Sequence, residues 1–183
     1  EYCLPEGYHC STKPKFLTPD EIRRLVTAFA ELGVWKIRLT GGEPSVRKDF
    51  TEIIDIISQN KDIKLTTFTT NGYRLKDKAR EWYDAGMRSL NVSIDSLNRE
   101  KFHKITGHNR LDDILQGIEE SLAIGYQSLK VNVVLLKGVN DDELSDYMAY
   151  VRQRPVTVRF IELMQTGDNL DYFKTHHLSA DRI

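Results

Sequence analysis

Residues 34–44 read Val-Trp-Lys-Ile-Arg-Leu-Thr-Gly-Gly-Glu-Pro and run from a β-rich segment into a glycine turn. The β-branched and apolar residues at 34–40 predict a strand, in which successive side chains point to opposite faces. One face is then apolar and the other polar: Ile37 and Leu39 against Lys36, Arg38 and Thr40. The two glycines and Pro44 end the strand and leave main-chain groups open beside the Glu43 carboxylate.

Helical patterns alternate with further strands along the chain. Thr18-Pro19-Asp20-Glu21 is a capping box with proline at the first helical position, and apolar residues follow at helical spacing until Gly33. Strands are expected at 64–70, 89–94, 129–136 and 156–163, and helices after Asp49 and near 76–85, 111–124 and 142–152. Strands separated by helices pair in parallel. Five such units are too few for a closed eight-stranded barrel, which leaves an open doubly wound sheet or a partial barrel.

Every predicted strand carries polar side chains on one face. The polar set is Lys36, Arg38, Thr40, Thr67, Thr69, Asn71, Asn91, Ser93, Asp95, Lys130, Asn132, Thr157 and Arg159. Parallel sheets covered by helices on both sides are apolar on both faces, and barrel interiors are usually filled with Val, Ile and Leu. The pattern therefore predicts an α/β fold, a partial (incomplete) TIM-type barrel of parallel strands with outer helices. The alternative is an antiparallel sheet with one solvated face.

Four cations on this polar face predict a multiply charged anionic ligand. They are Lys36, Arg38, Lys130 and Arg159. Converging guanidinium and ammonium groups neutralise phosphates well, so a nucleoside triphosphate is the expected class of ligand.

The composition indicates one soluble globular domain over residues 1–183. With 26 Lys and Arg against 27 Asp and Glu, the chain lacks the bulk positive charge that drives nucleic-acid binding. No window reaches the roughly 18 apolar residues of a membrane span, and no signal peptide precedes the first helix, so we expect a cytoplasmic protein. Cys3 and Cys10 are too few for a disulfide scaffold, and a cytosolic thiol pair more often indicates metal or redox chemistry than a disulfide. Taken alone, each cysteine is more often an ordinary thiol than a ligand.

A set of motifs resembles those of one enzyme family. Gly-Gly-Glu-Pro after a strand, with Tyr2-Cys3 ahead of it, resembles the radical S-adenosylmethionine (SAM) enzymes. The wider set is similar to the GTP 3',8-cyclase family of molybdenum cofactor biosynthesis: Tyr-Cys-Leu-Pro-Glu-Gly-Tyr, Lys-Ile-Arg-Leu-Thr-Gly-Gly-Glu-Pro, Thr-Thr-Asn-Gly, Asn-Val-Ser-Ile-Asp-Ser-Leu, Leu-Lys-Gly-Val-Asn-Asp and Arg-Phe-Ile-Glu-Leu-Met. The resemblance covers nearly the whole chain and implies a radical SAM (β/α)6-like core with its first strand missing.

The resemblance also implies the chemistry. Three cysteines hold a [4Fe-4S] cluster whose fourth iron binds SAM, and cleavage of SAM gives a 5'-deoxyadenosyl radical. That radical takes a hydrogen atom from C3' of GTP, and the product is 3',8-cyclo-7,8-dihydroguanosine 5'-triphosphate.

Site residues follow from the resemblance position by position. Cys3 matches the last cysteine of the cluster loop. The positions that match SAM contacts are Tyr2, Gly42, Ser93 and Met164, and those that match GTP contacts are Arg38, Thr69 and Lys130, with Lys36 and Arg159 as further phosphate ligands. Several of these residues also lie on the polar face that the two-residue strand period predicts without reference to the family.

The chain departs from the family pattern at both ends. It begins one residue before the last cluster cysteine and stops at Ile183, before the family's second three-cysteine cluster. We therefore expect a truncated piece that is inactive alone. The whole enzyme is expected to bind GTP, take electrons from an unidentified reductant and form a homodimer, with no nucleic-acid or membrane partner. The alternatives are another radical SAM enzyme acting on a peptide and a noncatalytic nucleotide-binding module.

Some further residues carry separate expectations. Glu162 shares the apolar face of its strand and is a candidate buried acid with a structural partner. Trp35 and Trp82 are expected to pack in the core, and His176 and His177 to be exposed. A Schiff-base role for Lys130 is a minor alternative.

Overall fold

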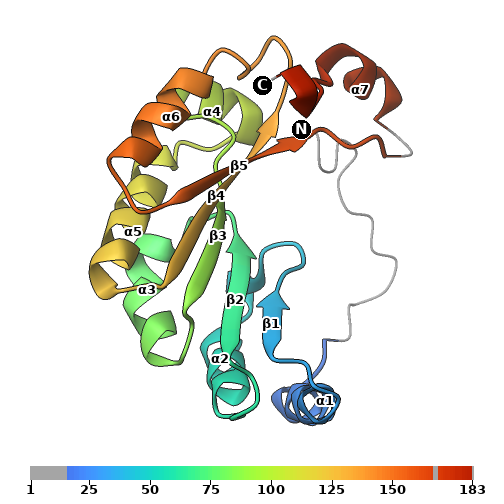
Figure 1. The fold of residues 1–183 in the computed structure, drawn as a ribbon, viewed down its shortest axis with the longest axis vertical. Helices are drawn as coiled ribbons and strands as arrows, with labels where there is room; N and C mark the ends of the chain where they lie inside the picture. The colour runs from blue at the N-terminus through green and yellow to red at the C-terminus, as the bar shows by residue number, and fades with distance from the viewer. Residues whose placement is uncertain (1–15, 167–168, 183) are drawn as a thin grey trace. The chain divides into compact units, whose positions relative to one another are not determined.

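The computed structural model describes residues 16–166 and 169–182. Five strands form one sheet in the order β1-β2-β3-β4-β5, which is also their order along the chain (Figure 1). They are β1 (Lys36–Leu39), β2 (Leu65–Thr70), β3 (Ser89–Ser93), β4 (Ser128–Leu135) and β5 (Thr157–Glu162). β1 pairs with β2, and β2 with β3, in parallel. The parallel pairing predicted from the alternation of helices and strands is thus confirmed for these two pairs.

Helices precede β1, connect successive strands and follow β5. They are α1 (Pro19–Glu31), η1 (Pro44–Val46), α2 (Phe50–Ser58), α3 (Leu75–Asp84), α4 (Arg99–Thr106), α5 (Leu111–Ile124), α6 (Leu144–Arg152), α7 (Leu170–His176) and η2 (Ala180–Arg182). The capping box at Thr18 is confirmed, because its side chain accepts from the Glu21 amide while Glu21 reaches back to the Thr18 amide. Helices α4 and α7 were not expected from the hydrophobic pattern. Both are short, with few apolar positions on which a period could show.

The chain divides into two compact units. Of the described residues, the first unit comprises 16–93 and 112–130, and the second comprises 94–111, 131–166 and 169–182. The prediction of a single domain over residues 1–183 remains a prediction.

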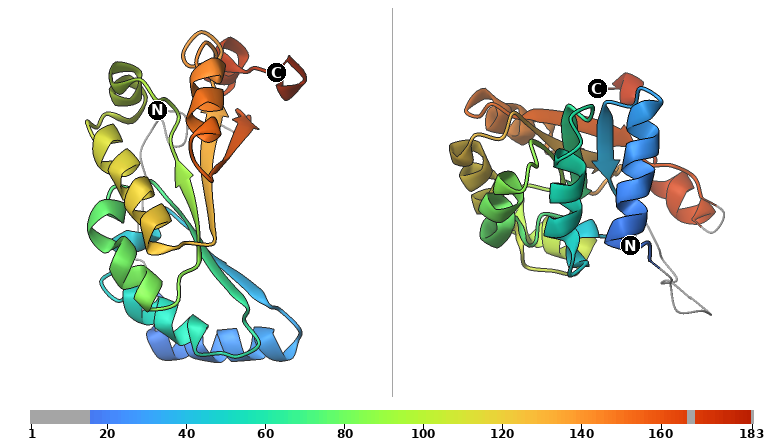
Figure 2. Two further views of the ribbon diagram at one scale, coloured as in Figure 1. Left: turned by 60° about the vertical axis from the view of Figure 1, so that its left-hand side comes forward. Right: turned by 90° about the horizontal axis from the view of Figure 1, so that it is seen from below.

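Two groups of buried side chains lie in the core of the first unit. Figure 2 shows α1 and α2 side by side, and Val26 and Ala30 of α1 join Ile53 and Ile57 of α2 in one buried cluster. The second cluster is aromatic, with the rings of Phe50, Phe68 and Trp82 edge to face at centroid distances of 5.0 to 5.5 Å. The prediction that Trp82 packs in the core is confirmed.

The corresponding prediction for Trp35 is wrong, because its side chain is 57% exposed. Trp35 lies just before the first paired residue of β1. Its carbonyl accepts hydrogen bonds from the amides of Lys64 and Leu65, so the main chain of Trp35 joins the sheet while the indole does not pack in the core.

The predicted apolar faces of β3 and β4 are buried, whereas those of β1 (Ile37, Leu39) and β5 (Val158, Phe160) are only partly buried. Leu90, Val92, Ile94, Val131 and Val133 are fully buried, and burial alternates residue by residue along β4. In the second unit the rings of Tyr147 and Phe160 meet edge to face at 5.7 Å. No helix in the described part of the chain has the length and apolar content needed to cross a membrane.

Gly117 marks a close approach of α5 to the start of α3. A Cβ at this position would lie 2.6 Å from the main-chain nitrogen of Lys76 and 2.9 Å from the Cβ of Leu75. Gly117→Ala should therefore destabilise the fold by about 1–3 kcal/mol, although alanine favours helices by about 1 kcal/mol over glycine. Urea denaturation measures the loss. The exposed neighbour Gln116→Ala serves as the control and should change stability by at most about 0.5 kcal/mol. Equal stability of the two variants would contradict the close packing.

Candidate functional site

The glycine turn after β1 presents bare main chain. Gly41 and Gly42 are exposed, and no heavy atom lies within 4 Å of the place where a Cβ would stand on either. A cavity of about 400 Å³ borders Gly41 and Gly42 on the side of α1 and α2. A ligand can therefore approach the peptide groups of this turn closely.

The Glu43 carboxylate is fully engaged in hydrogen bonds. Its Oε1 accepts from the amide and hydroxyl of Ser45, at 3.1 and 2.6 Å, and from the Thr70 hydroxyl at 3.0 Å. Its Oε2 accepts from the Asn71 amide at 2.7 Å. The side chain thus ties the glycine turn to the carboxyl end of β2. Glu43 holds the turn in place and leaves the main chain of the glycines to contact a ligand.

Two arginines stiffen the same region. Arg74 donates from Nη1 to the Ser45 carbonyl at 2.6 Å. Arg47 donates to both carboxylate oxygens of Asp49 at 2.7 Å, and this contact holds the pKa of Asp49 below its usual value. Bidentate pairs of this kind fix geometry as well as charge. Arg74, at the N-cap of α3, thus holds the main chain of Ser45, and Arg47 holds the residue that precedes α2.

The register of β1, β2 and β3 places their polar side chains on one face. Arg38 lies beside Thr67, Thr67 beside Ser89, and Thr69 beside Asn91. Neighbouring residues in a parallel register point the same way, and the period of two adds Lys36 and Ser93 to this face. Lys36 and Arg38 are exposed, whereas Thr69, Ser93 and Lys130 are partly exposed. All five belong to the first unit.

Part of the polar face is not open to solvent. Thr67 is 1% and Asn91 2% exposed, and Asn91 donates from Nδ2 to the Thr67 hydroxyl and the Phe68 carbonyl at 3.3 and 3.4 Å. The polar face predicted along every strand is therefore not exposed to solvent throughout. At mid-strand these two residues satisfy each other, and the accessible polar groups lie on either side of them.

Two predicted site residues lie in the second unit. Arg159 is half-buried and donates from Nε to the Asn132 side-chain oxygen at 3.0 Å. Met164 follows β5 and is 72% exposed. Asn132 shares the polar face of β4 with Lys130, and its contact with Arg159 gives it a role that the sequence did not assign.

The predicted cluster ligand Cys3 and the predicted SAM neighbour Tyr2 lie outside the described residues. Within 16–166 and 169–182, no group of three or more His, Cys, Asp or Glu side chains is arranged to hold a metal ion.

Glu162 is not the buried acid that its strand position suggested. It is exposed at the end of β5, where Oε1 accepts from the Ala180 amide at 2.9 Å and Oε2 lies 3.1 Å from His177 Nε2. These two hydrogen bonds, the Ala180 amide foremost, lower the pKa of the Glu162 carboxyl. His176 Nδ1 lies 3.0 Å from the Lys137 carbonyl oxygen. Both histidines are only partly exposed, and their contacts connect α7 and its C-terminal end to β4 and β5.

Comparison with known proteins gives the family. The model of the Radical SAM superfamily matches residues 1–151. The chain belongs to this superfamily. It is 56% identical over 180 residues to the GTP 3',8-cyclase of Stenotrophomonas maltophilia strain R551-3, and 52% identical over 184 residues to that of Aeromonas hydrophila. These matches cover 98% of the chain but 55% and 54% of the relatives, so the chain spans about half the length of the curated relatives it matches.

Solved structures agree on the fold. Methylornithine synthase superposes with a TM-score of 0.65 at 17% identity, over 91% of this chain and 50% of that one. The partial TIM-type barrel class predicted from the alternating strand faces is confirmed.

Removing one charge at position 43 tests the support of the glycine turn. Glu43→Gln places an amide group where Ser45, Thr70 or Asn71 donates, so the free energy of unfolding should fall by about 1–3 kcal/mol. Urea denaturation measures the change. Glu52→Gln, on an exposed position of α2, removes the same charge and should cost at most about 0.5 kcal/mol. A Glu43→Gln protein as stable as this control would contradict the assigned role.

Proposed function

We propose that the complete protein is a radical SAM lyase of the GTP 3',8-cyclase type. It would convert GTP to 3',8-cyclo-7,8-dihydroguanosine 5'-triphosphate in molybdenum cofactor biosynthesis. The observation that carries this proposal is the shared polar face of β1, β2 and β3, where exposed Lys36 and Arg38 lie on the same face as Thr69 and Ser93. The 52% and 56% identity to curated cyclases supports the same substrate.

The described residues fit SAM in donor type and access. The open peptide groups at Gly41 and Gly42 suit the amino and carboxylate groups of an amino acid, and the Ser93 hydroxyl can donate and accept. When bound, the [4Fe-4S] cluster and SAM supply an alkyl radical able to remove a hydrogen atom. Cys3 as a cluster ligand, Tyr2 beside SAM and Met164 near its adenine remain predictions, as do the two clusters of the whole enzyme.

The cations suit the triphosphate of GTP. Lys36 and Arg38 are two residues apart on the polar face of β1, where each can donate to a different phosphate oxygen. Arg159 is oriented by Asn132, which limits its freedom and lowers the entropy lost on binding phosphate. Thr69 and Lys130 complete the proposed GTP contacts. We further propose a cytoplasmic homodimer that takes its electrons from a separate reductant.

An anaerobic assay tests the reaction. The complete protein, with its clusters reconstituted, should form 5'-deoxyadenosine and a cyclic nucleotide derived from GTP when given GTP, SAM and reductant. Formation of 5'-deoxyadenosine without a GTP-derived product would favour a peptide-modifying radical SAM enzyme. Tight GTP binding without SAM cleavage would favour a noncatalytic nucleotide-binding module.

The cation assignment has its own test. Lys36→Ala or Arg38→Ala should lower the preference for GTP over GMP by about tenfold, the loss expected for one charge-assisted hydrogen bond. Competition binding with the complete protein measures the preference. Lys104→Ala removes one exposed positive charge from α4 and should leave it unchanged. An unchanged preference for GTP over GMP in both Lys36→Ala and Arg38→Ala would contradict the assignment of these cations to the phosphates.

A further inference from the structure

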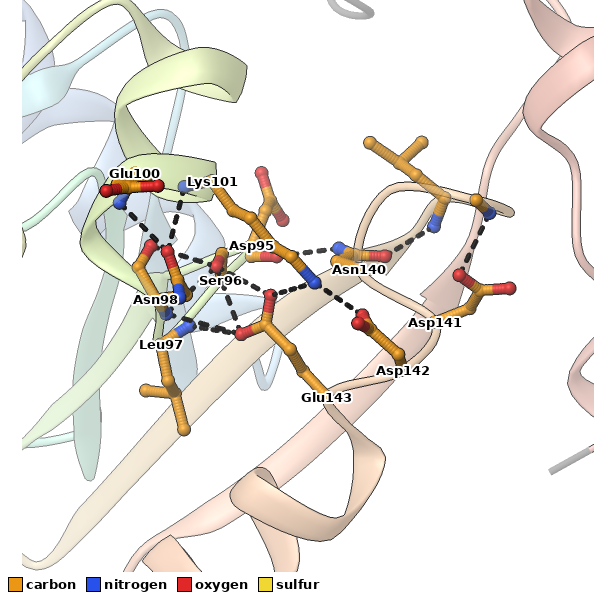
Figure 3. A network of polar contacts seen from close by, with 12 residues as sticks. Asp95, Ser96, Leu97, Asn98, Glu100, Lys101, Asn140, Asp141, Asp142 and Glu143 are labelled. Atoms are coloured by element: carbon orange, nitrogen blue, oxygen red, sulfur yellow. Dashed lines mark hydrogen bonds and ion pairs between the residues drawn. The ribbon is translucent and has the colours of Figure 1, made fainter.

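The turn that follows β3 is held by buried polar side chains from the segment between β4 and α6 (Figure 3). Asn140 is 1% exposed and donates from Nδ2 to the carbonyl oxygens of Asp95 and Val134, at 2.6 and 2.8 Å. Its Oδ1 accepts from the Leu136 amide at 2.8 Å. One amide side chain thus uses both its ends on main-chain groups and fixes the carbonyl of Asp95.

Glu143 holds the next part of the same turn. Its carboxylate is 3% exposed and accepts from the Ser96 hydroxyl at 2.8 and 3.0 Å. It also accepts from the amides of Leu97 and Asn98, at 2.8 and 3.3 Å. Lys101 lies 3.5 Å from Glu143 Oε1 and pairs more closely with Asp142, at 2.5 Å. The buried charge is therefore partnered by hydrogen-bond donors and a cation.

Tyr147 fixes the start of the turn. The side chain is 1% exposed, and its hydroxyl donates to the Ile94 carbonyl at 2.8 Å. The Ile94 amide in turn donates to the Asn132 carbonyl at 3.0 Å. Over residues 94–98, four of the five residues have a main-chain atom held by contacts from residues 132–147.

We propose that Asn140, Glu143 and Tyr147 are positioning residues for the SAM site and act through Ser93. The inference rests on the proposed function, which assigns Ser93 to SAM. Ser93 is the residue directly before this turn, so the position of its hydroxyl depends on the path of the main chain at 94–98. Hydrogen bonds weaken steeply with distance and angle, and a loosened turn would therefore weaken the Ser93 contact before it unfolds the protein.

Burial of three polar side chains argues for a requirement on geometry. Apolar packing stabilises a turn at lower cost than a buried carboxylate, which must be desolvated. The three side chains reach the same short turn from three different positions, and their hydrogen bonds to it restrain main-chain groups or the Ser96 hydroxyl. We infer that the turn must keep one conformation.

A pair of tyrosine variants separates positioning from stability. Tyr147→Phe removes only the hydroxyl and keeps the ring against Phe160. Tyr126→Phe is the matched control, because Tyr126 is also buried and donates to a main-chain carbonyl, that of Ala79, at 2.8 Å. In the complete protein with its clusters reconstituted, both variants should lower the melting temperature by similar amounts. Only Tyr147→Phe should raise the Kd for SAM, by about three- to tenfold, the effect of weakening one hydrogen bond.

A second variant reports on the turn without catalysis. Glu143→Gln should speed amide hydrogen exchange at Leu97 and Asn98 and raise the Kd for SAM, while the Kd for GTP stays at the wild-type value. Equal SAM affinity in Tyr147→Phe and Tyr126→Phe, with unchanged affinity in Glu143→Gln, would overturn the positioning role and leave the proposed function intact. Failure of the wild-type protein to bind SAM would overturn both.

Discussion

The two-residue period of parallel strands is the constraint on which both the core and the candidate site depend. Residues paired in register lie on the same face of the sheet, so polar residues on neighbouring strands form one polar face and apolar residues form the other. Phe68, Leu90 and Val92 are completely buried on one side, while Lys36 and Arg38 stand exposed on the other. The residues that stabilise the first unit and those that would bind a ligand therefore come from the same short strands.

Where the strands end, side-chain acceptors take over the hydrogen bonds that neighbouring strands supply within the sheet. Glu43 binds the turn after β2, and Glu143 binds the turn after β3. Main-chain amides in such turns lack strand partners, and a buried amide without a partner costs about 1–3 kcal/mol. These two acids supply the missing acceptors, so turns without regular structure keep defined shapes beside the polar face.

The local signals in the sequence predicted most of the elements, and long-range contacts limited the rest. Thr18 and Gly33 marked the two ends of α1 because capping depends on a few neighbouring residues. The predicted burial of Trp35 was wrong, since its burial depends on what packs over the end of β1, which no local pattern encodes. The predicted burial of Glu162 was wrong for a similar reason, because its partners, His177 and Ala180, come from beyond α7. The site itself was predicted in part. Strand period selected Lys36, Arg38 and Ser93. Two of the partners of Glu43, however, lie 27 and 28 residues along the chain, and only the fold brings them together.

Lysine labelling with and without GTP tests most directly whether the polar face of the sheet binds the nucleotide. The complete protein is treated with an amine-acylating reagent, and modification of each lysine is read by mass spectrometry. GTP should protect Lys36 and Lys130, on the polar face, and leave Lys61 and Lys104, on a turn and on α4, unchanged. Equal labelling of Lys36 and Lys130 with and without saturating GTP would contradict the account.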